Sequence, residues 1–343
     1  MMQARFVKYK LSFKRPSITS RGIINTKDSW FIILTEKDKS GIGECNILKG
    51  LSYDDHPNFE AYLEKFCNQI NSGKLEMDLT HWPAIKMGYE TALLSLKSLN
   101  PYELFPSLFT QGEKAIPING LVWMGSFDYM KTQIDNLLDH EFRCIKIKIG
   151  ALDFDEELRL LAKIRERYDA NTVTIRVDAN GAFSPKDVLN KLDRLSAFQI
   201  HSIEQPIEVN QWEFMSTLCD KSPIPIALDE ELIGVFDLEI QSKLLSQIQP
   251  QYVIFKPSLL GGFSSTQQWI NLAQQYNVGW WITSALESNI GLNAIAQWTF
   301  THNLSIPQGL GTGSLFTNNI DSPMVIKKGC LWNDKLISWK KIF

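Results

Sequence analysis

Short apolar segments alternate with amphipathic ones from Ala115 onward, and this alternation restricts the fold more than any other feature of the sequence. The repeat is about 25–30 residues long. Amphipathic segments such as 153–168 and 184–198 begin with a capping residue or an early proline, as helices do. Alternation of strands and helices at this period predicts right-handed crossovers and a parallel sheet. The expected strands are 115–123, 144–150, 172–180, 198–206, 224–230, 251–258, 278–286 and 306–311.

Eight such strands within about 200 residues fit a closed (β/α) barrel of the TIM type. An open, doubly wound sheet is the alternative architecture. Its nucleotide-binding versions carry Gly-x-Gly-x-x-Gly or a Walker loop after a strand, and neither motif occurs here. We therefore expect an α/β barrel with its functional residues at the strand ends.

The first hundred residues follow a different pattern, which predicts a separate α+β unit. The expected elements are strands at 4–13 and 29–37, a polar loop at 14–28, a glycine-rich turn at 41–52, and helices at 58–70 and 83–99. The tail from Thr317 returns to mixed character, and we expect it to pack back on this first unit.

The composition argues against several classes of protein. A formal net charge of −3 at pH 7 gives no electrostatic attraction to nucleic acid or anionic lipid. Five cysteines without a Cys-x-x-Cys pair argue against a disulfide framework or a structural zinc site. The N-terminal segment lacks the apolar core of a secretory signal, and no apolar run approaches the roughly 18 residues of a membrane helix. We expect a cytoplasmic protein that binds neither nucleic acid nor membrane.

Three acids stand at the ends of successive expected strands, about one strand–helix unit apart: Asp178, Glu204 and Asp229. In a barrel these positions lie at similar height and point into the mouth, where three carboxylates repel one another unless a cation lies between them. Carboxylate oxygens suit a hard divalent ion, above all Mg²⁺. The alternative is that each acid is only a helix cap. Strand alternation predicts that Asp229 faces inward and that Glu230 shares the outer face of its strand.

Lysines from two further strands point to the same mouth. Lys146 and Lys148 share the inner face of 144–150, with isoleucines on the outer face, and Lys256 occupies the inner face of 251–258. These strands flank the three acids, so the buried ammonium charges can be balanced. A lysine close to Mg²⁺ and to a second lysine should have a lowered pKa, as a general base requires.

Three other readings of this pattern remain. A structural salt-bridge network could fill the barrel without catalysing anything. The chain could also be a non-catalytic protein that has the barrel fold and only binds a ligand. A Schiff-base aldolase would use Lys256 as a nucleophile without metal, but it would leave the three acids without a role.

The joint pattern resembles the enolase superfamily, and specifically its muconate-lactonising subgroup. The segment 41–52 also resembles the Gly-x-Gly-Glu segment of that family's cap. The resemblance implies a modified (β/α)7β barrel with an N-terminal α+β capping domain. The implied domains are the cap at 1–110, completed by the tail at 317–343, and the barrel at 111–316.

The resemblance also implies roles for individual residues. Asp178, Glu204 and Asp229 would hold Mg²⁺, for which Mn²⁺ can substitute. Lys148 would be the general base and Lys256 its partner across the site. Lys146 would lower the pKa of Lys148. Asn180 would contact the metal ligands without binding the metal itself. Family chemistry removes the proton alpha to a carboxylate, and the resulting ene-diolate is stabilised by the metal.

Segments 283–298 and 306–316 resemble those of the o-succinylbenzoate synthases of menaquinone biosynthesis, a family within this subgroup. This implies syn-dehydration of 2-succinyl-6-hydroxy-2,4-cyclohexadiene-1-carboxylate, a small carboxylate substrate. Lys148 would take the alpha proton and then protonate the departing hydroxide, while Lys256 stabilises the ring's negative charge. Ser284 and Ser288 are candidate ligands of the substrate carboxylates.

Two related activities remain as alternatives. Dipeptide epimerases usually carry Asp-x-Asp after the last strand to hold the substrate ammonium, whereas this chain has no acid there until Asp321. N-acylamino-acid racemase fits better, because its substrate also lacks a free amine. The segment 16–25 could close over the site as a lid, or it could be an ordinary surface loop. The oligomeric state stays open.

Overall fold

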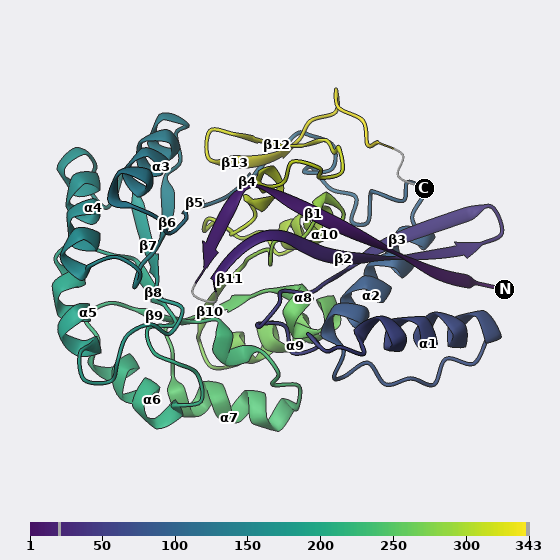
Figure 1. Cartoon of the computed structure of the whole chain (residues 1–343), viewed down its shortest axis with the longest axis horizontal. Helices are drawn as coiled ribbons and strands as arrows, with labels where there is room; N and C mark the ends of the chain where they lie inside the picture. The colour runs from purple at the N-terminus through teal and green to yellow at the C-terminus, as the bar shows by residue number, and fades with distance from the viewer. Residues whose placement is uncertain (20–21, 341–343) are drawn as a thin grey trace.

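The computed structural model describes residues 1–19 and 22–340 and has a cap beside an α/β barrel (Figure 1). The cap consists of a three-stranded antiparallel sheet, in the order β1-β2-β3, covered by two helices. Its elements are β1 (Gln3–Thr19), β2 (Gly22–Glu36), β3 (Lys39–Asn46), α1 (Phe59–Ser72) and α2 (Pro83–Lys97).

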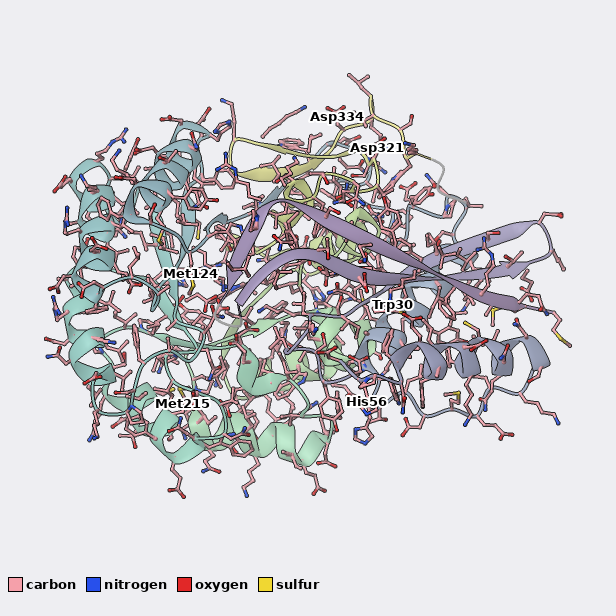
Figure 2. All side chains as sticks on the ribbon, viewed as in Figure 1. Trp30, His56, Met124, Met215, Asp321 and Asp334 are labelled. Atoms are coloured by element: carbon pink, nitrogen blue, oxygen red, sulfur yellow. The ribbon has the colours of Figure 1, made fainter. Side chains whose placement is uncertain are left out.

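The cap forms its own core because one face of the apolar run in β2 packs against its helices. Trp30, Ile32 and Leu34 point to the helices, and Trp30, labelled in Figure 2, has its ring centroid 4.8 Å from that of Phe59 in α1. This arrangement confirms the expected α+β character of the N-terminal region.

The barrel contains seven parallel strands in the order β11-β10-β9-β8-β7-β6-β5, with helices outside them. The strands are β5 (Gly120–Val122), β6 (Cys144–Lys148), β7 (Thr174–Asp178), β8 (Ser202–Glu204), β9 (Ile226–Leu228), β10 (Tyr252–Phe255) and β11 (Gly279–Ile282). The helices are α3 (Phe127–Asp139), α4 (Phe154–Arg167), α5 (Val188–Ser196), α6 (Trp212–Lys221), α7 (Leu238–Ile248), α8 (Pro257–Leu260), α9 (Gly262–Gln275) and α10 (Asn289–Thr301).

The eighth expected strand, 306–311, makes only single bridges. Gln308 pairs with Ile118 on one side and Gly309 with Thr283 on the other, so this segment connects the first and last strands without a ladder. The expected strand at 115–123 is also divided. Its first part, β4 (Ile116–Pro117), leaves the barrel and pairs with the C-terminal tail.

Side chains separate into two layers along β6. Ile145 and Ile147 are buried in the main core that the outer helices cover. The interior of the barrel below the mouth is filled by a smaller apolar cluster, in which the guanidinium of Arg176 lies 3.9 Å from the ring centroid of Trp281. The isoleucines of β6 therefore face outward, as alternation predicts.

The C-terminal tail contacts both parts of the chain. Its strands β12 (Met324–Lys327) and β13 (Cys330–Asn333) form a sheet with β4. Phe316 bridges to Phe13 of the cap, and the Trp339 ring stacks on Tyr102 with centroids 4.5 Å apart. The domain boundaries expected from the resemblance stay a prediction.

The expected polar loop at 14–28 is wrong. β1 and β2 continue through it as a hairpin, with pairing shifted between Ser12 and Ser17, next to Pro16, which has no N–H to donate. Of the lid segment 16–25, residues 16–19 and 22–25 are strand, and residues 20–21 lie outside the described part. The hairpin reaches from the cap toward the barrel (Figure 1). Within residues 1–19 and 22–340, we find no helix long and apolar enough to cross a membrane.

Candidate active site

A cavity of about 1400 Å³ lies between the cap hairpin and the mouth of the barrel. The cap contributes Phe13, Lys14 and Arg15 of β1 to its lining, and the barrel contributes the strand ends. Met124, labelled in Figure 2, lines the same space after β5. The lysines and the asparagine that the sequence singles out also line it: Lys146, Lys148, Asn180 and Lys256.

The three predicted acids come together because their strands are neighbours in register. Asp178 ends β7 and Glu204 ends β8, and the two residues are cross-strand partners. Asp229 directly follows β9. All three side chains are buried, so the carboxylates need positive charge close by.

The lysines supply that charge in the structure. Lys146 Nζ lies 2.8 Å from Asp178 Oδ2 and 2.5 Å from Glu204 Oε2. Lys148 Nζ lies 2.9 Å from the same Asp178 oxygen, and Lys256 forms an ion pair with Asp229. The flanking arrangement expected from strand order is therefore present.

Burial and the neighbouring charges shift the pKa values of several of these groups. Burial alone would raise the pKa of Asp178, but the ammonium groups of Lys146 and Lys148 hold it below its ordinary value. Burial and the negative charge of Asp178 raise the pKa of Glu204. Burial would lower the pKa of Lys146 and Lys256, yet the neighbouring carboxylates raise both.

The chemistry of this donor set fits a divalent cation. Glu204 Oε1 is buried and has no hydrogen-bond partner in the described structure, so one carboxylate oxygen remains free for a ligand. Among the described residues, no three His, Cys, Asp or Glu side chains already have the arrangement of a metal site, because ammonium groups lie between the carboxylates. Carboxylates that hold buried ammonium groups have the charge to hold Mg²⁺.

Asn180 forms hydrogen bonds with Lys148, the candidate base, and with Glu230, whose position the sequence did not predict. Lys148 Nζ donates to Asn180 Oδ1 at 2.7 Å, and Asn180 Nδ2 donates to Glu230 Oε1 at 2.9 Å. Glu230 was expected on the outer face of its strand, and this is wrong. The strand ends at Leu228 and a 3-10 turn begins at Glu230, so the alternation stops and Glu230 lines the cavity.

Glu231 and Gln205 are further buried polar residues beside the strand ends, and the sequence did not predict their roles. Glu231 Oε1 accepts from Trp212 Nε1 and from Asn210 N, both at 2.8 Å, and its Oε2 accepts from Gln205 Nε2 at 3.2 Å. The sequence feature that could have indicated Glu231 is the run Asp229-Glu230-Glu231. The run alone does not indicate that its three acids lie in three different surroundings.

The two serines expected near the substrate occupy different surroundings. Ser284 lines the cavity, and its Oγ lies 2.6 Å from Thr312 Oγ1. Ser288 is fully buried outside the cavity lining and donates from Oγ to Glu44 Oε2 at 2.6 Å. This geometry gives no support to Ser288 as a substrate ligand.

The part of the cavity lining at the end of the expected eighth strand carries no acid. It is formed by residues 309–315, all glycine, leucine, threonine or serine. The next acid along the chain, Asp321, is exposed in the tail and accepts from Lys340 N through its backbone carbonyl (Figure 2). Asp321 does not line the cavity.

Comparison with known proteins shows extended similarity. The family model described as enolase C-terminal domain-like matches residues 129–335. The chain is 44% identical to an o-succinylbenzoate synthase of Desulfotalea psychrophila, over 96% of this chain and 98% of that protein. A D-Ala-D/L-Ala epimerase of Cytophaga hutchinsonii is 26% identical, over 86% and 82% of the two chains. The crystal structure of MenC from Desulfotalea psychrophila superposes with a TM-score of 0.87 at 42% identity, covering 96% of this chain and 99% of that one.

Proposed function

The chain belongs to the enolase superfamily, and from this membership we propose that it is a Mg²⁺-dependent o-succinylbenzoate synthase. In this reaction 2-succinyl-6-hydroxy-2,4-cyclohexadiene-1-carboxylate loses water and becomes 2-succinylbenzoate, an aromatic intermediate of menaquinone biosynthesis. The observation that carries the proposal is the nearly full-length match to a synthase of that name.

Lys148 is the proposed base. Its Nζ is held between Asp178 and Asn180, at 2.9 and 2.7 Å. As a neutral amine it takes the proton alpha to the ring carboxylate, and the electrons of the broken C–H bond move toward that carboxylate. The C–O bond then breaks on the same face, and Lys148 returns the proton to the departing hydroxide. Water leaves, and the lysine is neutral again.

Lys256 and the acids deal with the charge that this step creates. Asp178, Glu204 and Asp229 would hold Mg²⁺, which when bound neutralises negative charge developing on the substrate carboxylate. The Lys256 ammonium, paired with Asp229, would stabilise negative charge spread over the ring. Lys146, paired with Asp178 and Glu204, keeps these carboxylates in place.

The cavity wall favours this substrate over a dipeptide. Residues 309–315 offer no carboxylate for a substrate ammonium, and Asp321 lies outside the cavity. We expect the succinyl chain to lie against hydroxyl groups of the lining such as those of Ser284 and Thr312.

The test is an ultraviolet assay for 2-succinylbenzoate with purified protein and Mg²⁺. Racemisation of N-acyl amino acids and of dipeptides in D₂O is measured alongside. Aromatic product formed at a rate typical of enzymes, about 1 s⁻¹ or faster, supports the proposal. Deuterium exchange of a dipeptide or an N-acyl amino acid without aromatic product contradicts it in favour of an epimerase or racemase. Full activity in EDTA with borohydride trapping on Lys256 would contradict it in favour of an aldolase.

A further inference from the structure

A buried polar contact joins the cap to the barrel beside the cavity wall. It begins on β3, where Cys45 points into the cap core. Because side chains alternate along a strand, Glu44 and Asn46 point the other way, toward the barrel. Both are buried, with exposed fractions of 2% and 0%.

Asn46 holds the turn between β11 and α10. Its Nδ2 donates to the carbonyl of Ala285 at 2.8 Å and approaches Glu287 Oε1 at 3.4 Å. A hydrogen bond within the turn also stabilises it, since Ala285 N donates to Glu287 Oε2 at 2.7 Å. Leu286, between the two, has φ of 62°, a left-handed backbone that is strained for leucine. Contacts from the cap therefore help to maintain a strained turn.

Glu44 holds the beginning of α10. Its Oε1 accepts from Ser288 N at 3.0 Å, and its Oε2 accepts from Ser288 Oγ at 2.6 Å and from Gly291 N at 3.0 Å. A carboxylate at a helix N-terminus is favourable, because N–H groups there lack helical partners. Behind it, Ser29 Oγ donates to Glu44 at 2.7 Å, and Lys27 Nζ, which donates to Ser29 Oγ, lies 3.9 Å from Glu44.

The close approach depends on Gly291. A Cβ at this position would lie 2.8 Å from both Glu44 Oε2 and Glu287 Cγ. Any larger residue would displace the Glu44 carboxylate or the Glu287 side chain from its present position. The helix sequence therefore fits this contact.

The cap also docks on the barrel through apolar contacts. Apolar clusters already join the two parts, one with Phe13 and Phe316 and another with Phe31 and Ile290. Burying polar groups costs free energy unless each is paired. Directional hydrogen bonds add a defined geometry for the groups that they join. Here these groups are Ala285 of the cavity wall and, shortly after it in the chain, Glu287, Ser288 and Gly291.

We propose that Asn46 and Glu44 are positioning residues of the active site: from the cap, they fix the conformation of the wall formed by Ser284, Ala285 and Leu286. These three residues line the cavity. The inference rests on the proposed function to the extent that the cavity must hold the substrate. Asn46 and Glu44 thereby affect substrate binding through the turn between β11 and α10, although neither residue lines the cavity.

The experiment compares Asn46→Ala, Asn46→Leu and Glu44→Gln with the wild type, all loaded with Mg²⁺. Asn46→Leu keeps the side-chain volume and removes the donor. Glu44→Gln keeps the volume and replaces one acceptor. We expect KM for the cyclohexadiene substrate to rise about tenfold while kcat changes by less than about threefold, because the wall contacts the substrate away from the reacting carbon. Hydrogen–deuterium exchange of segment 283–288 should become faster in each variant.

Asn71→Ala is the matched control. The Asn71 side chain also makes two backbone hydrogen bonds, to Ala4 N and Ala4 O, but within the cap. It should leave KM and the exchange of 283–288 at wild-type values. If the Asn46 variants behave like Asn71→Ala in both measurements, the inference is overturned. A wild type without dehydratase activity would contradict the proposed function, and the exchange measurement would then decide the inference alone.

Discussion

Glu204 is the residue whose surroundings indicate a bound cation most directly. It is buried, it lies 2.5 Å from Lys146 Nζ through Oε2, and its Oε1 has no hydrogen-bond partner among the described residues. We expect Glu204→Gln to weaken Mg²⁺ binding about 100-fold, because the affinity of a carboxylate site depends on its charge. Isothermal titration with MgCl₂ measures this. Glu231→Gln, which alters a buried carboxylate bonded to Trp212 and Asn210, should keep the affinity within about threefold. Equal losses in both variants would contradict the ligand assignment.

Lys148 lines the cavity and is the proposed base. Lys148→Ala removes the proposed base, so kcat for dehydration should fall by at least about 10³-fold. The circular dichroism spectrum should not change, since the side chain lies at the cavity surface. Lys163→Ala, on an exposed position of α4, is the control for general effects of removing a lysine. Near-normal turnover in Lys148→Ala would rule out the base assignment.

The positions of single side chains could be predicted where a strand sets them. Lys146 and Lys148 alternate with Ile145 and Ile147 along β6, and the structure confirms that the lysines and the isoleucines face opposite sides. The same rule was wrong for Glu230, because β9 ends two residues earlier. Ser288 shows a different limit. Its contact with Glu44 joins residues distant in sequence, and no local pattern indicates such a pair.

At the scale of elements, the packing of β3 against α2 is unusually close. A Cβ on Gly43 would overlap the carbonyl of Gly88 and lie 2.6 Å from Ala92 N, and both are backbone atoms that cannot move alone. We expect Gly43→Ala to reduce the free energy of unfolding by about 3 kcal/mol, measured by urea denaturation. Gly311→Ala, where the nearest atom is 3.5 Å away, should cost much less. Similar costs for the two variants would contradict the packing argument.

Elements were predictable where the apolar period is long and regular. The helix expected at 153–168 is α4, Phe154–Arg167, and the side chain of Asp153 caps it. The outer part of the hairpin formed by β1 and β2 was expected to be a loop, because it is rich in polar residues and contains a proline. Pairing with a neighbouring strand, which is not local in sequence, stabilises it.

Glu287 lies at the contact between cap and barrel, and we expect it to make the stability of the whole molecule depend on pH. Burial raises the pKa of Glu287 to about 7, and the negative charge of Glu44 adds to this. The native state then holds the proton more tightly than the unfolded state, so the free energy of unfolding falls as pH rises from about 4.5 to 7. A shift of this size corresponds to about 3 kcal/mol.

Glu287→Gln should remove that part of the pH dependence. Urea denaturation of the wild type and the variant between pH 4 and 8.5 measures the difference, in which contributions from other groups such as Lys27 and Asp54 largely cancel. The variant should gain stability relative to the wild type as pH rises to 7, and the difference should then stay level. Glu36→Gln, at the exposed end of β2, is the control. A difference that does not vary with pH would contradict the assignment.

The sequence did not predict how the cap and the barrel together form one cavity. The repeat of strands and helices predicted the barrel, and the spacing of acids and lysines predicted the mouth. Neither could predict that the β1–β2 hairpin supplies Phe13, Lys14 and Arg15 to the cavity lining, since that depends on how two separately patterned units dock. The tail was expected on the cap, yet β12 and β13 also pair with β4.

The contact of Phe316 with Phe13 tests this docking directly. Phe316 is buried, its ring centroid lies 4.7 Å from that of Phe13, and Leu11 completes the cluster. Phe316→Ala should cost about 3 kcal/mol of stability and release the hairpin from the barrel. Because Phe13 lines the cavity, KM for the substrate should also rise, by about tenfold.

Phe109→Ala separates the effect on the hairpin from the loss of stability. Phe109 is fully buried in the barrel core and packs against Phe300, away from the cavity lining. Its removal should cost a similar free energy of unfolding and leave KM unchanged within about twofold. Both quantities are measured for both variants well below their melting temperatures. If KM rises equally in the two, the hairpin contact has no specific effect on the cavity; if only Phe316→Ala raises it, the cap is part of the substrate site.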